Sequence, residues 1–376
     1  MPPTTRRSIT PTSKQITFVF NIDEEEPRTR TLLKPTSPNS APSKKRGRKK
    51  ATPRYDGPLQ SLADLMDLAE AEVHYDNIDV ARLVVIKEEL QELNALIGLD
   101  TIKQTIFEQL VFYMQHLHEG SEMYLNTVIY GPPGTGKTTV AKLMGRMFSK
   151  LRILTIPDGY EYEYDEDEEN VVDIFEVARR DDFIGQYLGS TALKTQEYLE
   201  MCLGGVVFLD EVYSMGNKEG TDSFAKEAID TINLFLSEHR DHFMMIVAGY
   251  HDEIQSCFFK YNEGLRRRFM WYHTIEPYSP EQLRDIFLSK LIQSDWTYRD
   301  DVPDAMLLAI RTDKELFVDQ AGSIENFVTL LKIKHGTRVV LLPAEAKKRI
   351  VPEDIAVAIQ SIKKKQKPAD YLSMYM

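Results

Sequence analysis

The sequence has few cysteines and no long apolar run, and both features narrow the class of protein. There are two cysteines among 376 residues, Cys202 and Cys257, each in apolar surroundings where an isolated cysteine usually behaves as a small buried hydrophobe. No disulfide framework is indicated. No stretch reaches the ~18 apolar residues that a membrane-spanning helix needs, and the N-terminus lacks the apolar core of a secretory signal. We therefore expect a cytosolic or nuclear protein with no membrane partner, and not a secreted one.

Metal-ligating side chains are also sparse. The eight histidines include two close pairs, His116 with His118 and His239 with His242. Neither pair has an evident third ligand, so the sequence does not predict a protein-bound zinc site. Any metal is expected to arrive with a ligand.

Charge is divided unevenly along the chain. The formal net charge is −12, but residues 1–55 contain thirteen Lys or Arg and only four acidic residues. This surplus of nine positive charges leaves −21 for the remainder. An acidic body repels duplex DNA, so any nucleic-acid contact has to come from the basic segment or from a local patch.

The N-terminal 60 residues have the composition of a disordered basic tail. Residues 1–60 are rich in Pro, Ser, Thr and basic residues, which cannot bury enough apolar surface to offset chain entropy. Within this tail, "QITFVFNI" at 15–22 is either a strand or a docking peptide. The cluster "KKRGRKK" at 44–50 is a nuclear-import signal, a nucleic-acid contact or a solvated basic linker.

The rest of the chain divides into three parts. Residues 61–93 have apolar positions at helical spacing and predict a helical segment. Over 94–275, short apolar runs ("TVIY", "RILTI", "GVVFLD", "FMMIVAG") alternate with amphipathic stretches, which predicts an α/β domain with a parallel sheet. Over 276–376 helical patterns dominate, and Ser279 with Pro280 is a helix-start signal. We expect a helical second domain there.

One glycine-rich turn has the sequence and context of a phosphate-binding loop. "GPPGTGKT", Gly131–Thr138, follows a β-like run and precedes an amphipathic helix, which is the context that a Walker A motif requires. The glycines let backbone N–H groups surround phosphate oxygens, and the helix N-terminus adds its dipole. Lys137 would reach the β and γ phosphates and the Thr138 hydroxyl would ligate Mg²⁺. The predicted ATP-binding residues of this loop are Pro132, Pro133, Gly134, Thr135, Gly136, Lys137, Thr138 and Thr139.

A second motif supplies the carboxylates that hydrolysis needs. "GGVVFLDEVY" at 204–213 is an apolar strand ending in Asp210 and Glu211. Asp210 would orient magnesium and its waters, and Glu211 is placed to accept a proton from the attacking water. An apolar run ending in Asp-Glu is common by itself, and it becomes specific because it follows a Walker A motif.

From about Leu96 to Arg338 the sequence resembles the AAA+ ATPases of the CbbX/CfxQ/SpoVK type. The resemblance rests, in order, on "LIGLDTIKQTI", "GPPGTGKTTVAKLMG", "RDDFIGQYLGSTALKT", "GGVVFLDEVYSM", "FAKEAIDTINLFLSEHRD", "MIVAGYHDEI" and "NEGLRRRF". It implies an AAA+ P-loop core with a helical lid, and a ring-forming motor, usually hexameric, that binds ATP between subunits and pulls on a protein substrate. Red-type Rubisco activation itself is not inferred.

The resemblance also assigns roles to single residues. Ile97 and Gly98 resemble the segment that lines the adenine pocket. In "GLRRRF", Arg268 resembles the arginine finger and Arg266 a second family arginine, and a guanidinium suits the neutralisation of phosphate charge by a neighbouring subunit. Without the resemblance, three adjacent arginines would be read as a solvated basic turn.

A further carried-over element is the pore loop. "GQYLG" at 185–189 resembles an aromatic-aliphatic-glycine loop facing a central channel, formed by Tyr187, Leu188 and Gly189. A tyrosine can grip extended polypeptide of almost any sequence through its apolar face. The alternative is a core tyrosine at the start of the following helix. The flanking glycines favour the mobile loop.

The chain departs from the family in two places. Gly322 and Glu325 stand where the sensor-2 region usually has arginines, so either Lys332 or Arg338 substitutes, or the coupling between nucleotide and lid is altered. Tyr250 falls near the sensor-1 position. The second departure is an acidic insertion, "YEYEYDEDEEN" at 160–170, which is either a solvated loop or a surface for a basic partner or for the basic tail.

Three functions remain open from the sequence. The first is an ATP-driven motor that remodels a protein substrate. The second is a DNA-associated ATPase anchored by the basic cluster, which predicts stimulation by DNA and strong salt dependence. The third is a nucleotide-gated scaffold that binds ATP but hydrolyses it weakly, as the sensor-2 change suggests.

Overall fold

The computed structural model describes residues 53–71, 73–118, 123–157, 174–187, 189–344 and 347–366, and the backbone of three short strands at 17–19, 29–33 and 161–162. Most of the basic tail, the cluster 44–50 and most of the acidic insertion lie outside these residues. Leu188 of the predicted pore loop does too. None of the described helices is long and apolar enough to cross a membrane.

A five-stranded parallel sheet forms the centre of the molecule, with the strand order β5-β6-β7-β3-β8. The parallel α/β architecture expected from the sequence is confirmed, and three of the apolar runs named above are strands. The buried runs become strands because both faces of the sheet are covered. The strands are β3 (Asn126–Tyr130), β5 (Phe175–Ala178), β6 (Val206–Leu209), β7 (Met244–Gly249) and β8 (Phe269–Thr274).

The apolar run "RILTI" at 152–156 does not form a strand, so that prediction was wrong. Its Ile153 and Leu154 are buried in the core, but Arg152 has a φ of 49° and the Thr155 N–H donates to the carbonyl of Asp241. The run therefore buries its side chains as an irregular turn, with its backbone tied to another loop. The edge of the sheet is formed instead by β5, whose burial is only partial.

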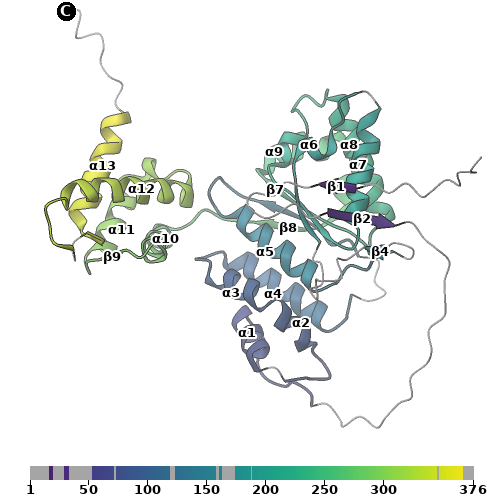
Figure 1. Cartoon of the computed structure of the whole chain (residues 1–376), viewed down its shortest axis with the longest axis horizontal. Helices are drawn as coiled ribbons and strands as arrows, with labels where there is room; N and C mark the ends of the chain where they lie inside the picture. Colours follow the sequence, from purple (N-terminus) through teal and green to yellow (C-terminus); the bar gives the residue numbers. More distant parts are fainter. Residues whose placement is uncertain are drawn as a thin grey trace, which may run out of the picture.

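Helices cover both faces of the sheet (Figure 1). Neighbouring residues of one strand point to opposite faces: in β6, Val206 and Phe208 join one hydrophobic cluster and Val207 and Leu209 the other. The first face carries α1 (Leu62–Ala71), α2 (Val80–Val85), α3 (Lys87–Ala95), α4 (Asp100–Met114) and α5 (Lys137–Lys150). The second carries α6 (Arg180–Phe183), α7 (Ser190–Met201), α8 (Ser223–Glu238) and α9 (His251–Cys257).

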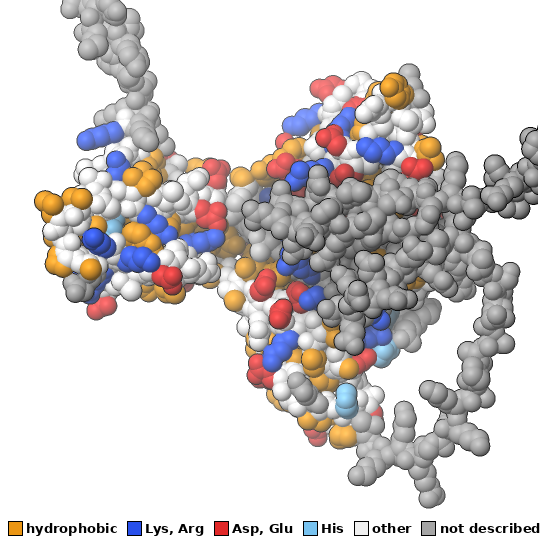
Figure 2. Space-filling view, in the orientation of Figure 1, with side chains coloured by type: hydrophobic (Ala, Val, Ile, Leu, Met, Phe, Trp, Pro, Cys, Tyr) orange, Lys and Arg blue, Asp and Glu red, His pale blue; other side chains and the backbone are white. Residues whose placement is uncertain are grey.

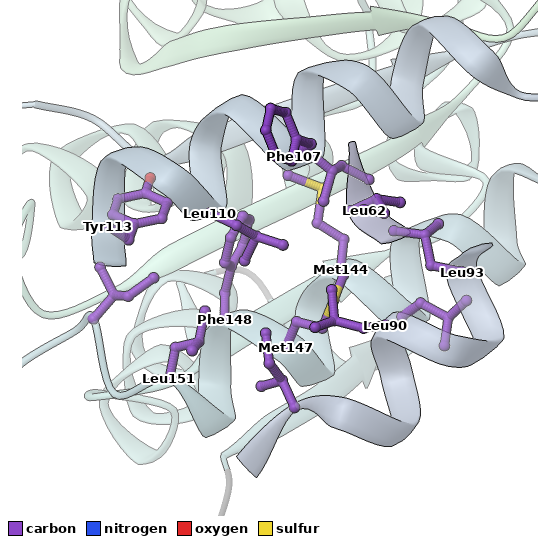
Figure 3. Close-up of a cluster of buried hydrophobic side chains, with 14 of the residues drawn as sticks. Leu62, Leu90, Leu93, Phe107, Leu110, Tyr113, Met144, Met147, Phe148 and Leu151 are labelled. Atoms are coloured by element: carbon purple, nitrogen blue, oxygen red, sulfur yellow. The ribbon is translucent and has the colours of Figure 1, made fainter. Parts of the chain in front are cut away.

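The helical segment 61–93 packs into the core of the α/β domain. Figure 3 shows Leu62 of α1, Leu90 and Leu93 of α3, and Phe107 of α4 converging on Met144 of α5. Burial of this many large apolar side chains is a strong contribution to stability, at about 25 cal/mol per Å² of apolar surface. The segment thereby supports α5, the helix that follows the phosphate-binding loop. The boundaries expected at 93, 94 and 275 stay predictions.

The C-terminal part, the lid, is helical as expected and has its own hydrophobic core. It contains α10 (Pro280–Gln293), α11 (Val302–Thr312), α12 (Gln320–Arg338) and α13 (Pro352–Gln366). The predicted helix start is confirmed: Ser279 caps α10 and forms a capping box with Gln282. Two two-residue strands, β9 (Thr297–Tyr298) and β10 (Arg349–Ile350), pair within the lid. In Figure 1 the lid lies to one side of the sheet, joined through the chain that follows β8.

A small separate sheet joins three short strands: β1 (Thr17–Val19), β2 (Thr29–Leu33) and β4 (Glu161–Tyr162), in the order β1-β2-β4. Both pairings are antiparallel. β1 lies in the segment 15–22, for which the sequence left a strand and a docking peptide open. The pairing of β2 with β4 brings the tail's backbone against the start of the acidic insertion.

Candidate nucleotide-binding and hydrolysis site

The candidate site lies at the edge where the parallel strands end. The phosphate-binding loop follows β3, Asp210 follows β6 and Tyr250 follows β7. Because parallel strands end at one edge, residues far apart in the sequence meet there, and this edge is where open α/β sheets bind ligands.

The backbone of the loop has the shape that a phosphate cradle needs. Gly134 and Gly136 have φ values of 68° and 88°, a backbone region in which residues other than glycine are strained. A Cβ at Gly134 would also lie 2.0 Å from the carbonyl oxygen of Asp319 in the lid. Thr135 is buried and its hydroxyl donates to the carbonyl of Pro132. Each end of the loop has one exposed and one half-buried residue: Pro133 and Thr139 are exposed, and Pro132 and Thr138 are half-buried.

Lys137 is folded back onto its own loop. Its Nζ donates to the carbonyl oxygens of Gly131 and Pro132 over 2.8 and 2.7 Å, and it lies 4.9 Å from the ring centroid of Tyr250. Burial lowers the pKa of Lys137, against the opposing influence of Asp210 and Glu211. Phosphate oxygens would replace two carbonyl acceptors with charged ones, which form stronger hydrogen bonds with an ammonium group.

The two predicted motifs meet through a direct contact. The Thr138 hydroxyl donates to Oδ2 of Asp210 over 2.7 Å, and Oδ1 of Asp210 accepts from the Glu211 N–H over 2.9 Å. A hydroxyl beside a carboxylate is an all-oxygen donor pair, the kind that Mg²⁺ prefers together with water and phosphate oxygens. The residues present therefore fit the expected ion. Among the described residues, no group of three or more acidic, His or Cys side chains is placed to hold a metal ion.

Sequence analysis missed an aromatic pair beside these residues. Tyr213 follows Glu211 in the 3₁₀ helix η1 (Val212–Met215), and its ring stacks on Tyr250 with centroids 6.0 Å apart. Burial and a hydrogen bond to Glu211 raise the pKa of Tyr213 to about 12. The Tyr213 hydroxyl therefore stays protonated beside Glu211. Its place in "DEVY" is the only sequence signal for it.

The lid contacts the phosphate-binding loop directly. The Ala321 N–H donates to the carbonyl of Gly134, and the Tyr278 hydroxyl donates to the carbonyl of Thr135, both over 3.1 Å. The start of α12 thus rests on the loop. No local pattern predicts these contacts, because they join segments of the chain that are distant in sequence.

The predicted base-binding residues lie between the α/β domain and the lid. Ile97 packs against the hydrophobic core of the lid. Gly98 has a φ of 68°, and a Cβ there would lie 2.6 Å from Nε2 of Gln282. A small pocket of about 100 Å³ adjoins them, lined by Leu99, Asp100, Thr101, Ile102, Thr274, Ile275, Glu276, Pro277, Tyr278 and Gln282.

The predicted trans-acting arginines stand on η3 (Leu265–Arg268), just before β8. Arg266 is exposed, contacts the Gln255 side chain and lies 5.8 Å from the ring centroid of Phe259. Arg268 is half-buried and makes hydrogen bonds within its own protomer. In the part of the chain that the structure describes, the hydrogen bonds of both arginine side chains go to Gln255, Ser237 and Gly264, outside the phosphate-binding loop.

Tyr187 is 74% exposed, which does not fit the alternative of a core tyrosine. Its carbonyl accepts from the Ser190 hydroxyl at the start of α7. Gly189 has a φ of 84° and a Cβ there would meet nothing within 4 Å. The tyrosine therefore stands in solvent on a turn that a glycine makes accessible.

The lid cations proposed as sensor-2 substitutes are engaged elsewhere. Arg338 makes a bidentate pair with Asp354, with N···O distances of 2.7 and 3.0 Å. Lys332 lies 5.4 Å from the ring centroid of Trp296. Glu325 pairs with Lys290. Gly322 is near Asp319 at the start of α12, so this position adds no charge to the site.

Comparison with known proteins agrees with the geometry. The family described as "ATPase family associated with various cellular activities (AAA)" matches residues 127–270. The putative cfxQ-like protein R730 of Acanthamoeba polyphaga mimivirus is 34% identical over 284 residues, which are 75% of this chain and 66% of that protein. Stage V sporulation protein K of Bacillus subtilis is 34% identical over 238 residues, 61% of this chain and 68% of that protein. The chain belongs to the AAA ATPase family, and within it to the CbbX/CfxQ/SpoVK type.

The chain thus spans about two thirds of the length of these relatives. Among solved structures, the Holliday junction branch migration motor RuvB of Thermotoga maritima is 14% identical, with a TM-score of 0.48 and a coverage of 74% of each chain.

Proposed function

We propose that this AAA ATPase hydrolyses ATP to ADP and phosphate and uses the energy to remodel a protein substrate. The observation that carries the hydrolytic part is the hydrogen bond between Thr138 and Asp210. It brings the two motifs into one site, with Glu211 next to Asp210 along the chain. Family membership supports ATPase chemistry in general, and the specific reaction is our proposal.

Each residue of the site has one task in this proposal. Lys137 exchanges its two carbonyl acceptors for phosphate oxygens. Thr138 and Asp210 would hold Mg²⁺, which supplies positive charge against the β and γ phosphates when bound. Glu211 accepts the proton of the attacking water. The Tyr213 hydroxyl, which stays protonated beside Glu211, would help to orient this carboxylate.

We also propose that the active form is a homo-oligomeric ring, expected to be a hexamer, in which Arg268 and Arg266 act on the nucleotide of a neighbouring copy. Their position on η3, away from the phosphate-binding loop of their own chain, supports action in trans. Tyr187, Leu188 and Gly189 would then line the central channel and grip the polypeptide. The exposure of Tyr187 supports this role.

Two variants test the motor. In Glu211→Gln, ATP binding should persist while turnover falls by about 100-fold or more, since a general base contributes at least that much. This variant, held with ATP, should retain its protein substrate for identification by mass spectrometry. Asp252→Asn, at a fully exposed acidic side chain, is the matched control and should leave turnover unchanged.

Tyr187→Ala should hydrolyse ATP at a rate within about twofold of the unaltered protein but fail to unfold the substrate. Tyr187→Phe, which keeps the apolar ring, should unfold it normally. The readout is ATP-dependent loss of fluorescence from a fluorescent protein fused to the captured substrate. Normal unfolding by Tyr187→Ala would rule out threading.

A weakly hydrolysing, nucleotide-gated scaffold is the second candidate, favoured by the engagement of Arg338 and Glu325 within the lid. Turnover measured in the assembled state separates it from the motor. The DNA-associated alternative rested on the cluster 44–50, which lies outside the described residues. On the face shown in Figure 2, acidic and basic side chains of the described residues are interspersed rather than segregated, so this face does not favour DNA binding.

A further inference from the structure

Arg268 is held in place by its own protomer. Its Nε donates to the hydroxyl oxygen of Ser237, and its Nη1 donates to the carbonyl of Gly264, both over 2.9 Å. Its backbone carbonyl accepts from Nδ2 of Asn126 over 2.8 Å. These bonds fix both the backbone and two of the three guanidinium nitrogens. Within the described residues, the third nitrogen, Nη2, has no acceptor.

The hydroxyl of Ser237 is committed to this geometry. It donates to the carbonyl of Asn233, one turn earlier in α8, over 2.8 Å. Since its single hydrogen is used there, a lone pair faces Nε of Arg268 and accepts from it. Ser237 lies in the last turn of α8, which ends at Glu238, and alanine has the higher helix propensity, so helix propensity alone gives no reason for a hydroxyl at this position.

The other two arginines of η3 are held differently. Arg266 and Arg267 are exposed, and Arg266 contacts the flexible side chain of Gln255 and the ring of Phe259. Only Arg268 has a rigid anchor formed by a helix hydroxyl and a backbone carbonyl. A side chain that is already oriented loses less conformational entropy when it meets a phosphate oxygen.

We propose that Ser237 is a positioning residue that orients the Arg268 guanidinium, with Nη2 free, toward the triphosphate bound by a neighbouring copy. This inference rests on the proposed function, in which Arg268 acts in trans. Ser237 itself touches no substrate. Its loss should lower the rate of hydrolysis without weakening ATP binding, because Ser237 acts on the site of another protomer.

Mixed assemblies test this directly. Lys137→Ala protomers lack a working phosphate-binding loop but supply Arg268, and Arg268→Ala protomers have a working loop but lack the arginine. Each is expected to be inactive alone, and their mixture should regain activity at sites where one type faces the other. Adding Ser237→Ala to the Lys137→Ala protomer should reduce the kcat of the mixture about tenfold and leave KM within twofold.

Adding Ser237→Ala to the Arg268→Ala protomer should change the kcat of the mixture by less than twofold, because the arginine that Ser237 orients is absent there. A structural role for Ser237 would lower activity in both arrangements. Ser237→Thr, which keeps the hydroxyl, should restore most of the rate. Ser237→Cys, similar in size but a poor acceptor, should behave as Ser237→Ala does and serves as a second variant if the alanine protein does not assemble.

Ser256→Ala is the matched control. The Ser256 hydroxyl also donates to the carbonyl one turn earlier in its helix, at Asp252, over 2.7 Å, but it holds no arginine, so activity should not change. If the two parent variants do not complement each other, the trans role of Arg268 in the proposed function fails. If they complement each other but Ser237→Ala in the Lys137→Ala protomer has no effect on kcat, only the role of Ser237 is overturned.

Discussion

His273 should make the α/β domain lose stability in mildly acidic solution. It lies on β8 opposite Ile129 of β3, is 5% exposed, and its Nε2 has no hydrogen-bond partner among the described residues. Burial lowers the pKa of His273 from its ordinary value of 6.5 to about 4. Above pH 6.5 the imidazole is neutral in both states. Between pH 6.5 and 4 the unfolded chain binds a proton that the folded protein does not.

The unfolded state therefore gains stability as the pH falls through this window. Linkage gives a loss of about 2 kcal/mol between pH 7.5 and pH 5, approaching about 3 kcal/mol near pH 4. His273→Leu has a side chain of similar volume without the titrating group. The unfolding free energy of His273→Leu minus that of the unaltered protein should therefore increase by about 2 kcal/mol when the pH changes from 7.5 to 5.

The chain's two tryptophans allow the measurement. With Trp296 in the lid replaced by phenylalanine, Trp271, two residues from His273 on β8, reports the unfolding of the sheet. Urea unfolding is followed by fluorescence at both pH values, with and without His273→Leu. All other titrating groups cancel in the difference. If the difference in unfolding free energy is the same at both pH values, His273 is not buried as a neutral imidazole.

Two further substitutions test the loop and the lid. Gly134→Ala should weaken binding of a fluorescent ATP analogue at least tenfold, because the φ of residue 134 is strained for alanine and a Cβ there would meet the lid. Gly336→Ala is the control and should leave binding unchanged, because a Cβ at this position of α12 has nothing within 4 Å. Asp354→Ala should destabilise the lid by about 2 kcal/mol, because the buried carboxylate bonds both Arg338 and the Val351 N–H and contacts the buried His335. Burial alone would raise the pKa of Asp354, but hydrogen bonds from Arg338 and His335 outweigh burial and lower this pKa below 3.8. The stabilisation by Asp354 should therefore be present above pH 3.8 and be lost as the pH falls further. The fluorescence of Trp296 would report the unfolding of the lid.

The residues of the phosphate-binding loop could be identified from the sequence because their chemistry is local. The loop's shape depends on glycines a few positions apart, and Lys137 and Thr138 follow them directly. Asp210 and Glu211 were also accessible, since a buried strand ending in acidic residues places them at the ligand-binding edge of a parallel sheet. Their contact with Thr138 follows from the sheet order, which the sequence does not state.

Other features depend on tertiary contacts that leave no local signal. The run 152–156 is as apolar as a strand, but its backbone bonds to the loop around Asp241, and apolar content alone does not separate these outcomes. The edge strands β5 and β8 contain exposed residues, and in β5 a glutamate interrupts the apolar residues. The contact of Ala321 with Gly134 joins the lid to the loop across more than half of the described chain.

The distribution of charge in the lid links hydrolysis to assembly under the proposed function. A triphosphate needs several positive charges to stabilise the transition state of its hydrolysis. Within one protomer Lys137 supplies one, whereas Arg338 is bound to Asp354 and Lys290 to Glu325. Gly322 adds none. Under the proposed function Mg²⁺ would add to the charge of Lys137, and Arg266 and Arg268 of another copy would add the charge that the lid does not supply, so we expect turnover to depend on the neighbouring protomer.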